Sequence, residues 1–385
     1  MTENSIIDRH KSSCCGCGNC AIGCSKNAIT MITDGEGFVY PTIDKGLCIN
    51  CGICLKLCPF EIKTGTHTNN VLVCYSGAYS IREELKKSSS GGAAHAIACA
   101  FIKRGGVVYG AIYSDDCRSV RVERIDKQDD LYKLRGSKYA QTIKGDTFKC
   151  IKAEVQSQQK VLFIGLPCEI AALKRFVGKT NDLFTVELIC SGNTSQKVHS
   201  EFIDYLNNKN HCIITNFTYR KKAKGWHWPY IEAKAGCKVV YSAPWSASMA
   251  GFAFKTLIRP SCYNCQYKGI NNVADITVGD FWGVKKADTR HNSLGVSAIV
   301  VHTENGKYML VGLEDFVLKN ACYNDILAGN PRITQCIKEA SNRKAFADIL
   351  SKEGLVKAYS SCYTTKDYIN CLLYTSPSPR DPKTS

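Results

Sequence analysis

The chain has 385 residues, 23 of them cysteines, and its 50 lysines and arginines against 34 aspartates and glutamates give a formal charge of +16. This length predicts two or three domains, and a hydrophobic content of 44% excludes wholesale disorder. No apolar run approaches the roughly 20 residues that span a bilayer, and no secretory signal is visible, so the cysteines favour metal ligation in a reducing cytosol and we expect a cytoplasmic protein.

Two cysteine motifs lie within the first 60 residues. Each has the spacing C-x2-C-x2-C-x3-C, and Pro59 follows the second motif. This repeat is typical of bacterial ferredoxins with two 4Fe-4S clusters, in which the fourth cysteine of each motif binds the cluster of the other. We therefore expect one cluster on Cys14, Cys17, Cys20 and Cys58, and a second cluster on Cys48, Cys51, Cys54 and Cys24.

Zinc is the alternative metal, but zinc sites use two CxxC pairs that are set further apart. Two features depart from the ferredoxin pattern, because Ser25 replaces a frequent proline and Cys15 is an extra thiol that competes with Cys14. Between the motifs, the sequence predicts two short strands around a turn at 34–37. Most of the chain follows the motifs, so the clusters are expected to feed a second site.

Residues 88–92 are rich in serine and glycine and precede a helix predicted over 93–104, which a buried strand at 107–113 follows. Small residues at a helix N-terminus leave backbone N–H groups free for an anion such as phosphate. A simple helix cap is the alternative. The loop at 134–141 is a second small, basic and aromatic segment of the same kind.

The next segment alternates strand, helix, strand and helix, with strands expected at 161–166 and 184–190 and helices at 169–177 and 195–206. This order predicts a parallel sheet. Functional residues of such sheets lie just past the carboxyl ends of the strands. Cys168 and Cys190 both lie at such positions and can point into one crevice.

Basic and aromatic residues alternate over 219–230. A lid over an anionic cofactor or substrate, a solvated loop and a nucleic-acid contact are the alternatives. One short patch does not support a nucleic-acid partner, and we expect none. Lys224, Trp226 and His227 are candidates for gripping an anionic substrate or donating a proton, although His227 is equally compatible with a structural role.

Cys262 and Cys265 form a further CxxC pair, ahead of a strand that ends near Asp280. Together with Cys168 and Cys190, this pair can complete a third site of four cysteines. Buried thiols with a redox or zinc role are the alternative. With three clusters bound, each of charge −2 when oxidised, the formal charge of +16 would fall to +10. A basic chain favours acidic partners or anionic cofactors, although general solubility explains the charge equally well.

Taken in order, these segments resemble the coenzyme F420 hydrogenase/dehydrogenase beta-subunit family, in its bacterial form with a fused dicluster ferredoxin. The resemblance covers nearly all of residues 1–300 and rests on the dicluster motif, SSSGG, GSKYAQ, GLPCE, the loop around Gly225 and Trp226, and RPSCYNCQYKG with ADITVGDFWG. It implies an α+β (α/β) fold: a ferredoxin-like module over 1–66, followed by mixed α/β flavin-binding domains over 67–155 and 156–370.

The resemblance also implies FAD in the central domain and a third 4Fe-4S cluster on Cys168, Cys190, Cys262 and Cys265. The implied flavin contacts are Ser88, Ser89, Ser90, Gly91, Gly92, Gly136, Ser137, Lys138, Tyr139 and Asp280. The expected protein is an oxidoreductase that moves electrons between ferredoxin or another redox protein, the clusters, FAD and a small organic substrate, deazaflavin-like or not. An electron-relay subunit of a larger hydrogenase or dehydrogenase complex is the main alternative, and a zinc-stabilised interaction module is the third.

The last residues, 371–385, do not read as part of the fold. Cys371 to Asp381 resemble the translation of a sequencing-library adaptor. We leave the segment out of the fold prediction and expect the native C-terminus to be missing. A genuine tail rich in proline and serine is the alternative.

Overall fold

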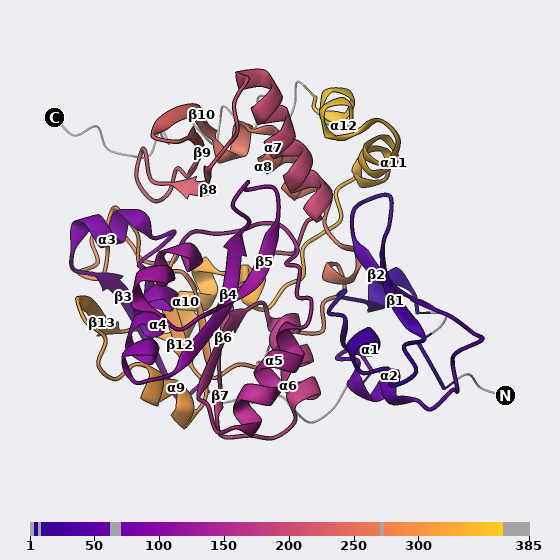
Figure 1. The fold of residues 1–385 in the computed structure, drawn as a ribbon. Coiled ribbons are helices and arrows are strands. Elements are labelled where there is room, and N and C mark those ends of the chain that lie inside the picture. Colours follow the sequence, from indigo (N-terminus) through magenta and orange to yellow (C-terminus); the bar gives the residue numbers. More distant parts are fainter. Residues whose placement is uncertain (1–3, 7–8, 62–70, 270–272, 365–385) are drawn as a thin grey trace.

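The computed structural model describes residues 4–6, 9–61, 71–269 and 273–364. Residues 4–6 and 9–61 form a small N-terminal module at one side of the molecule (Figure 1). Its elements are α1 (Asn19–Ile22), β1 (Ile29–Thr33), β2 (Val39–Ile43) and α2 (Ile53–Leu57). β1 and β2 pair antiparallel, and the Asp34 carboxylate closes their turn by accepting from the N–H groups of Glu36 and Phe38. The predicted hairpin is confirmed.

The two cysteine motifs have the same local backbone. Gly18 and Gly52 occupy the residue before α1 and α2, with φ angles of 83° and 75°. Only glycine adopts this left-handed conformation without strain. Each motif therefore turns sharply after its second cysteine and places its third cysteine at the start of a short helix.

An eight-stranded sheet forms the body of the molecule (Figure 1). Its order is β13-β3-β12-β11-β7-β6-β4-β5. The four strands β4, β6, β7 and β11 run parallel, and the other strands pair antiparallel. The strands are β3 (Val73–Tyr79), β4 (Val107–Tyr113), β5 (Val120–Ile125), β6 (Val161–Gly165), β7 (Leu183–Leu188), β11 (Ile276–Asp280), β12 (Ser297–Val301) and β13 (Phe316–Asn320).

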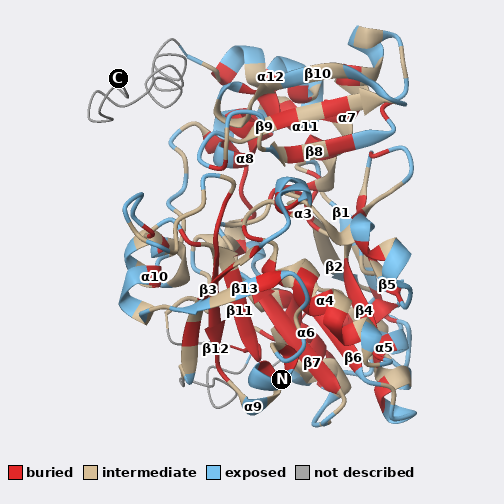
Figure 2. Ribbon diagram, turned by 90° about the vertical axis from the view of Figure 1, so that its left-hand side faces the viewer, coloured by how far each residue is buried: buried red, intermediate tan, exposed pale blue. Residues whose placement is uncertain are grey.

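Helices cover both faces of this sheet because its central strands are apolar on both sides. In β6, Leu162 packs on the face covered by α4 (Ala93–Lys103), whereas Val161 and Phe163 pack on the face covered by α5 (Thr147–Gln156) and α6 (Pro167–Val177). Figure 2 shows the central strands as almost continuously buried. The shorter helices around the sheet are α3 (Arg82–Lys87), α9 (Glu304–Met309) and α10 (Tyr323–Gly329).

A second layer packs above the body around its own apolar core. Its three-stranded sheet has the order β10-β9-β8, and α7 and α8 pack beside it. Two C-terminal helices complete the layer (Figure 1). The elements are α7 (Gln196–Asn210), β8 (Asn216–Lys221), β9 (Tyr230–Ala235), β10 (Lys238–Pro244), α8 (Met249–Thr256), α11 (Arg343–Glu353) and α12 (Leu355–Cys362).

The mixed α/β fold behind a ferredoxin-like module confirms the predicted fold class, and β6 and β7 pair in parallel as predicted. The boundary predicted between 155 and 156 falls inside the large sheet, since β3, β4 and β5 come before it and the other five strands after it. Within the described ranges, no helix is long and apolar enough to cross a membrane. Residues 371–385 lie outside those ranges.

Candidate cluster sites and cofactor cavity

The first candidate site is a small cavity inside the N-terminal module. Its lining includes the four cysteines expected to hold the first cluster, Cys14, Cys17, Cys20 and Cys58, together with Arg9 and Phe60. Three of the cysteines come from the first motif and one from the end of the second motif. The exchange of the fourth cysteine between motifs, which the spacing predicts, therefore agrees with this geometry.

Burial keeps these thiols in their neutral form while no metal is bound. Burial, with a smaller contribution from the nearby Cys14 and Cys58 thiols, raises the pKa of Cys20 to about 12. Burial also raises the pKa of Cys58 to about 11, against the opposing charge of Arg9. Metals bind the thiolate, so loading of this cavity releases protons.

The donor set fits an iron–sulfur cluster better than a single ion. Thiolates around one zinc ion all lie about 2.3 Å from the metal and crowd together, whereas the cysteines of a 4Fe-4S cluster bind four different irons. Within the described residues, no three His, Cys, Asp or Glu side chains lie close enough to hold one metal ion. Four cysteines around a cavity match the second arrangement.

The second motif lies nearer to solvent. Cys54 is buried and packs with Cys24 in a small apolar core that includes Ile29. Cys48 is half-buried and Cys51 is exposed. The pairing of Cys24 with Cys48, Cys51 and Cys54 stays a prediction.

Three of the four cysteines expected at the third site lie close together. Burial, with smaller contributions from the Cys190 and Cys265 thiols, raises the pKa of Cys262 to about 12. Burial raises the pKa of Cys265 to about 11, and Cys190 acts on it in the same direction. Cys336 also approaches, since its thiol lies 3.6 Å from the carbonyl oxygen of Cys265.

The fourth cysteine, Cys168, lies between this group and the N-terminal module. Its pKa is raised well above the ordinary value, first by its contact with Cys15 and then by burial, and Cys265 adds to the shift. Cys15 also contacts Cys17. The extra thiol of the first motif thus faces the body, and the ligands of the third site remain a prediction.

A larger cavity of about 530 Å³ opens above the carboxyl ends of the parallel strands. This volume lies within the range of small-molecule and cofactor sites. Most of the residues predicted to contact flavin line it, namely Ser88, Ser89, Ser90, Gly92, Gly136, Ser137, Lys138, Tyr139 and Asp280. Gly91 is not in the lining; a Cβ there would lie 2.0 Å from the carbonyl oxygen of Gly77, so Gly91 allows the loop to approach β3.

The cavity suits an anionic ligand at one end. The first residues of α4, Ala93 to His95, line it, and N–H groups at a helix N-terminus attract anions. Arg135 lies beside them, contacting the Glu84 carboxylate and donating to the His95 ring, 3.2 Å away. The buried indole N–H of Trp245, also in the lining, has no hydrogen-bond partner among the described residues and can serve a ligand.

Lys138 holds the second loop in shape. Its Nζ donates to the carbonyl oxygens of Lys133 and Arg135 at 2.9 and 2.7 Å. Burial lowers the pKa of Lys138 to about 7. Its amine is therefore occupied by backbone acceptors, and Lys138 supports the lining more than it adds positive charge to it.

The three residues proposed as catalytic from the 219–230 segment lie outside the cavity lining. Trp226 is buried, donates to Asp280 Oδ1 at 2.6 Å and stacks on Trp282 with ring centroids 4.5 Å apart. His227 is exposed, with its ring centroid 5.5 Å from that of Trp282, and Lys224, also exposed, lies over the Tyr230 ring. None of Lys224, Trp226 and His227 lines the cavity among the described residues, so their catalytic roles stay a prediction.

Arg220 takes the position nearest to the role predicted for that segment. It lines the cavity and pairs with Asp280, with Nη1 2.5 Å from Oδ2 and Nη2 3.2 Å from Oδ1. Its guanidinium is almost fully buried, which makes the charge pair a rigid part of the wall. The alternation of basic and aromatic residues gave no reason to choose Arg220 over its neighbours.

Cys190 connects the cavity to the cysteine groups. It lines the cavity and belongs to the group with Cys262 and Cys265. Glu169 also lines the cavity and forms a buried ion pair with Lys144, Nζ to Oε1 2.9 Å, beside Cys168 and Cys15. The cavity and the thiols therefore share one wall.

Comparison with known proteins places two parts of the chain. Residues 158–318 match the family model for the C terminus of the coenzyme F420 hydrogenase/dehydrogenase beta subunit, and residues 13–62 match the 4Fe-4S dicluster domain. The coenzyme F420-dependent sulfite reductase of Methanocaldococcus jannaschii is 24% identical over 172 residues, which are 45% of this chain and 26% of that protein. The chain thus spans about a quarter of the length of this curated relative.

A solved structure of the F420-reducing NiFe hydrogenase complex of Methanosarcina barkeri is also similar. The match covers 78% of this chain and 92% of the other chain, with 18% sequence identity and a TM-score of 0.44. The dicluster match bears out iron–sulfur binding by the module, whereas FAD rests on the cavity and the resemblance.

Proposed function

Since the chain belongs to the coenzyme F420 hydrogenase/dehydrogenase beta-subunit family and carries a 4Fe-4S dicluster domain, we propose that this iron–sulfur oxidoreductase depends on FAD and reduces or oxidises a small organic substrate. The observation that carries the proposal is the shared wall between the cavity and the thiols. FAD in the cavity would supply the exchange between single electrons and two-electron chemistry.

The thiols form an unbroken series between the cavity and the module. Each member is close enough to the next for its charge or its hydrogen bond to shift the neighbour's pKa. The series runs Cys190, Cys262, Cys265, Cys168, Cys15, Cys17 and Cys20. Clusters held by these residues would pass electrons between the cavity and the second motif in short steps.

The second motif is the candidate point of contact with an external carrier. Cys51 is exposed, and the apolar side chains of Leu47 and Ile49 beside it are 51% and 61% exposed. Exposed apolar side chains that lie near one another suit a contact with another protein. We infer that a redox protein such as a ferredoxin exchanges electrons here.

Charge indicates that this carrier is acidic. Each described acidic side chain of the module already has a partner. Asp34 pairs with Lys11, Glu36 with Arg343 and Glu61 with Arg9, and Asp44 accepts from the backbone N–H of Gly46. Among the described residues, no carboxylate pairs with Lys26, Lys45 or Lys56. A negative partner surface would complement these lysines and speed encounter.

Measurement of bound flavin tests the proposal. Protein made and reconstituted without oxygen is acid-denatured, and flavin in the supernatant is assayed by fluorescence beside protein-bound iron. About one flavin per chain is expected. Iron without flavin would leave an electron-relay subunit of a larger complex, and colourless protein containing zinc would leave an interaction module.

A matched pair of variants places the flavin. Ser89→Asp sets a carboxylate in the cavity lining beside Ser137, so repulsion of a phosphate should lower bound flavin about tenfold. Ser80→Asp, at an exposed position outside the lining, should leave flavin unchanged. Equal flavin in both variants would exclude this cavity as the flavin site.

A further inference from the structure

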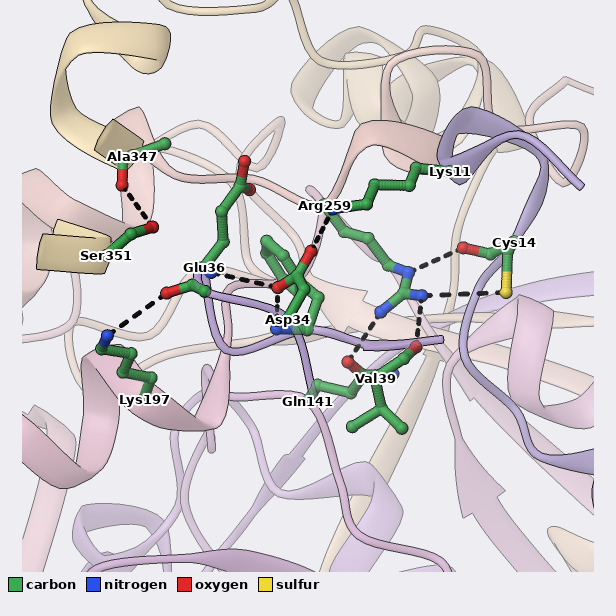
Figure 3. Close-up of polar contacts among 12 residues, drawn as sticks. Lys11, Cys14, Asp34, Glu36, Val39, Gln141, Lys197, Arg259, Ala347 and Ser351 are labelled. Atoms are coloured by element: carbon green, nitrogen blue, oxygen red, sulfur yellow. Dashed lines mark hydrogen bonds and ion pairs between the residues drawn. The ribbon is translucent and has the colours of Figure 1, made fainter. Parts of the chain in front are cut away.

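Arg259 is a buried arginine that reaches from the body into the N-terminal module. It is 1% exposed. Figure 3 shows its guanidinium donating to three oxygens: Nε to the carbonyl of Cys14 at 2.7 Å, Nη1 to Oε1 of Gln141 at 2.9 Å, and Nη2 to the carbonyl of Val39 at 2.8 Å. Two of these acceptors belong to the module, so Arg259 fastens it to the body.

All of these acceptors are neutral. No carboxylate of the described residues lies within ion-pair distance of Arg259, and its guanidinium carbon lies 4.3 Å from the centroid of the Tyr40 ring and 5.4 Å from that of the Phe38 ring. A buried charge without a compensating charge is strongly unfavourable. The position of Arg259 therefore calls for a negative group that the side chains around it do not supply.

Arg259 points at the first cluster site. Nη2 lies 3.8 Å from the Sγ atom of Cys14, which lines the cysteine cavity. Four thiolates and an oxidised 4Fe-4S core carry a net charge of −2, and one electron makes it −3. Such a cluster supplies the missing counter-charge.

We propose that Arg259 is the buried counter-ion of the cluster at Cys14, Cys17, Cys20 and Cys58, and that it favours the reduced state of this cluster over that of its neighbour. The inference rests on the proposed iron–sulfur loading of the first motif. The electron comes from the external carrier, and the fixed positive charge stabilises the extra negative charge. Arg259 acts as a positioning residue, because it touches a ligand of the cluster and no substrate.

Among the described residues, no buried cation accompanies the second motif as Arg259 accompanies the first. Lys45 and Lys56, close to its cysteines in the sequence, are exposed, so water and salt screen their charge. Arg9, which also lies near the first cluster, pairs with the Glu61 carboxylate and is largely neutralised. An electron that enters at the second motif would therefore be drawn towards the first, the cluster that lies against the body.

Redox titration followed by electron paramagnetic resonance tests the proposal. At the potential where the affected cluster is half reduced in the unmodified protein, Arg259→Gln should lower its ratio of reduced to oxidised form about tenfold, which is 59 mV for one electron. The other N-terminal cluster should keep its potential. Arg259→Lys should restore most of the shift, because it retains the charge.

Arg343→Gln is the matched control. Arg343 is also a buried arginine that ties the module to the body, but it has its own carboxylate in Glu36, 2.6 Å away. This variant should weaken the attachment of the module to the body. It should change the ratio of reduced to oxidised form of either cluster by no more than twofold. Equal shifts in Arg259→Gln and Arg343→Gln, or no shift in either, would overturn the inference.

A second variant covers the case in which Arg259→Gln does not fold. Gln141→Glu gives Arg259 a carboxylate partner without removing it, so the same cluster should become harder to reduce. An unchanged potential in Gln141→Glu would contradict the proposal. Iron content distinguishes failure of the proposed function from failure of the proposal for Arg259. Protein without iron would refute the proposed function, whereas iron-loaded protein with unshifted potentials would refute only the role of Arg259.

Discussion

The two cysteine motifs have the same spacing and the same glycine turn, yet they meet different surroundings. The first is enclosed by the body, which contributes Arg259 and places Cys168 against Cys15. The second presents Cys51 and Leu47 to solvent. Under the proposed function, identical local chemistry would acquire two roles from packing: an internal relay at the first motif and a contact point for a carrier at the second.

Removal of a ligand at the exposed motif should have the largest effect. Cys51→Ala should lower electron exchange with a reduced acidic ferredoxin at least about 100-fold, because loss of outer-shell partners alone costs 10–100-fold at metal sites. Flavin should stay bound, since the cavity is remote from Cys51. Stopped-flow absorbance and the flavin assay measure both. Cys150→Ala, at an exposed cysteine on α5, is the control, and flavin loss in folded Cys51→Ala would break the distinction between the motifs.

The packing of the N-terminal module against the body depends on the turn between β1 and β2. Gly37 has a φ of +84°, and an added Cβ would lie 2.3 Å from Cβ of Lys197 in α7. Gly37→Ala should therefore cost about 2 kcal/mol beyond backbone strain, which opens the module about thirtyfold more often. Hydrogen exchange of β1 and β2 reports this opening. Gly178→Ala also adds a methyl group at a positive φ, +88°, but with open space around it, so equal exchange in the module of both variants would contradict the packing argument.

Chelation should remove iron in two phases. The half-buried and exposed cysteines of the second motif let a chelator approach, whereas the first motif is covered by Arg259 and Phe60. We expect about a tenfold difference in rate, from the greater opening that the first site requires. Absorbance of the iron–chelator complex follows both phases. Cys51→Ala should show the slow phase alone, and a single phase in the unmodified protein would show equal protection.

The lysines around the second motif should give the smallest effect. Lys45→Glu with Lys56→Glu should slow reduction by an acidic ferredoxin about threefold at low salt, through loss of electrostatic attraction. The difference should vanish at 1 M salt, where the Debye length is about 3 Å. Lys344→Glu with Lys352→Glu, at two exposed positions on α11, provides the charge-matched control. If the rate does not depend on these lysines, the carrier binds at another face of the protein.

Local patterns predicted what depends on short stretches of chain. The spacing of the cysteines predicted that Cys58 joins the first motif, because only a few backbone geometries fit a cluster. The small residues at 88–92 predicted the start of α4 and a wall of the cavity for a similar reason. Strand ends and helix caps depend on short segments of chain, so local sequence patterns predict them directly.

Contacts between distant segments were not predictable in this way. Cys15 was treated as a competitor of Cys14, and only the packing of the module on the body turns it towards Cys168. The sequence makes Trp226 a candidate for substrate contact, which stays a prediction, but does not indicate that its indole donates to Asp280. Arg259 had no signal at all, since one arginine before Pro260 reveals nothing about a partner 245 residues earlier.

The contact between Glu36 and Arg343 joins residues that are 307 positions apart. A ribosome adding 5 to 20 residues per second needs about 15 to 60 s to make the intervening chain. During that interval the nascent module lacks the helix that later contacts its hairpin, so we expect its cysteines to be more accessible to iron and sulfide than in the folded chain. On this view, the first cluster would assemble most readily before translation reaches α11.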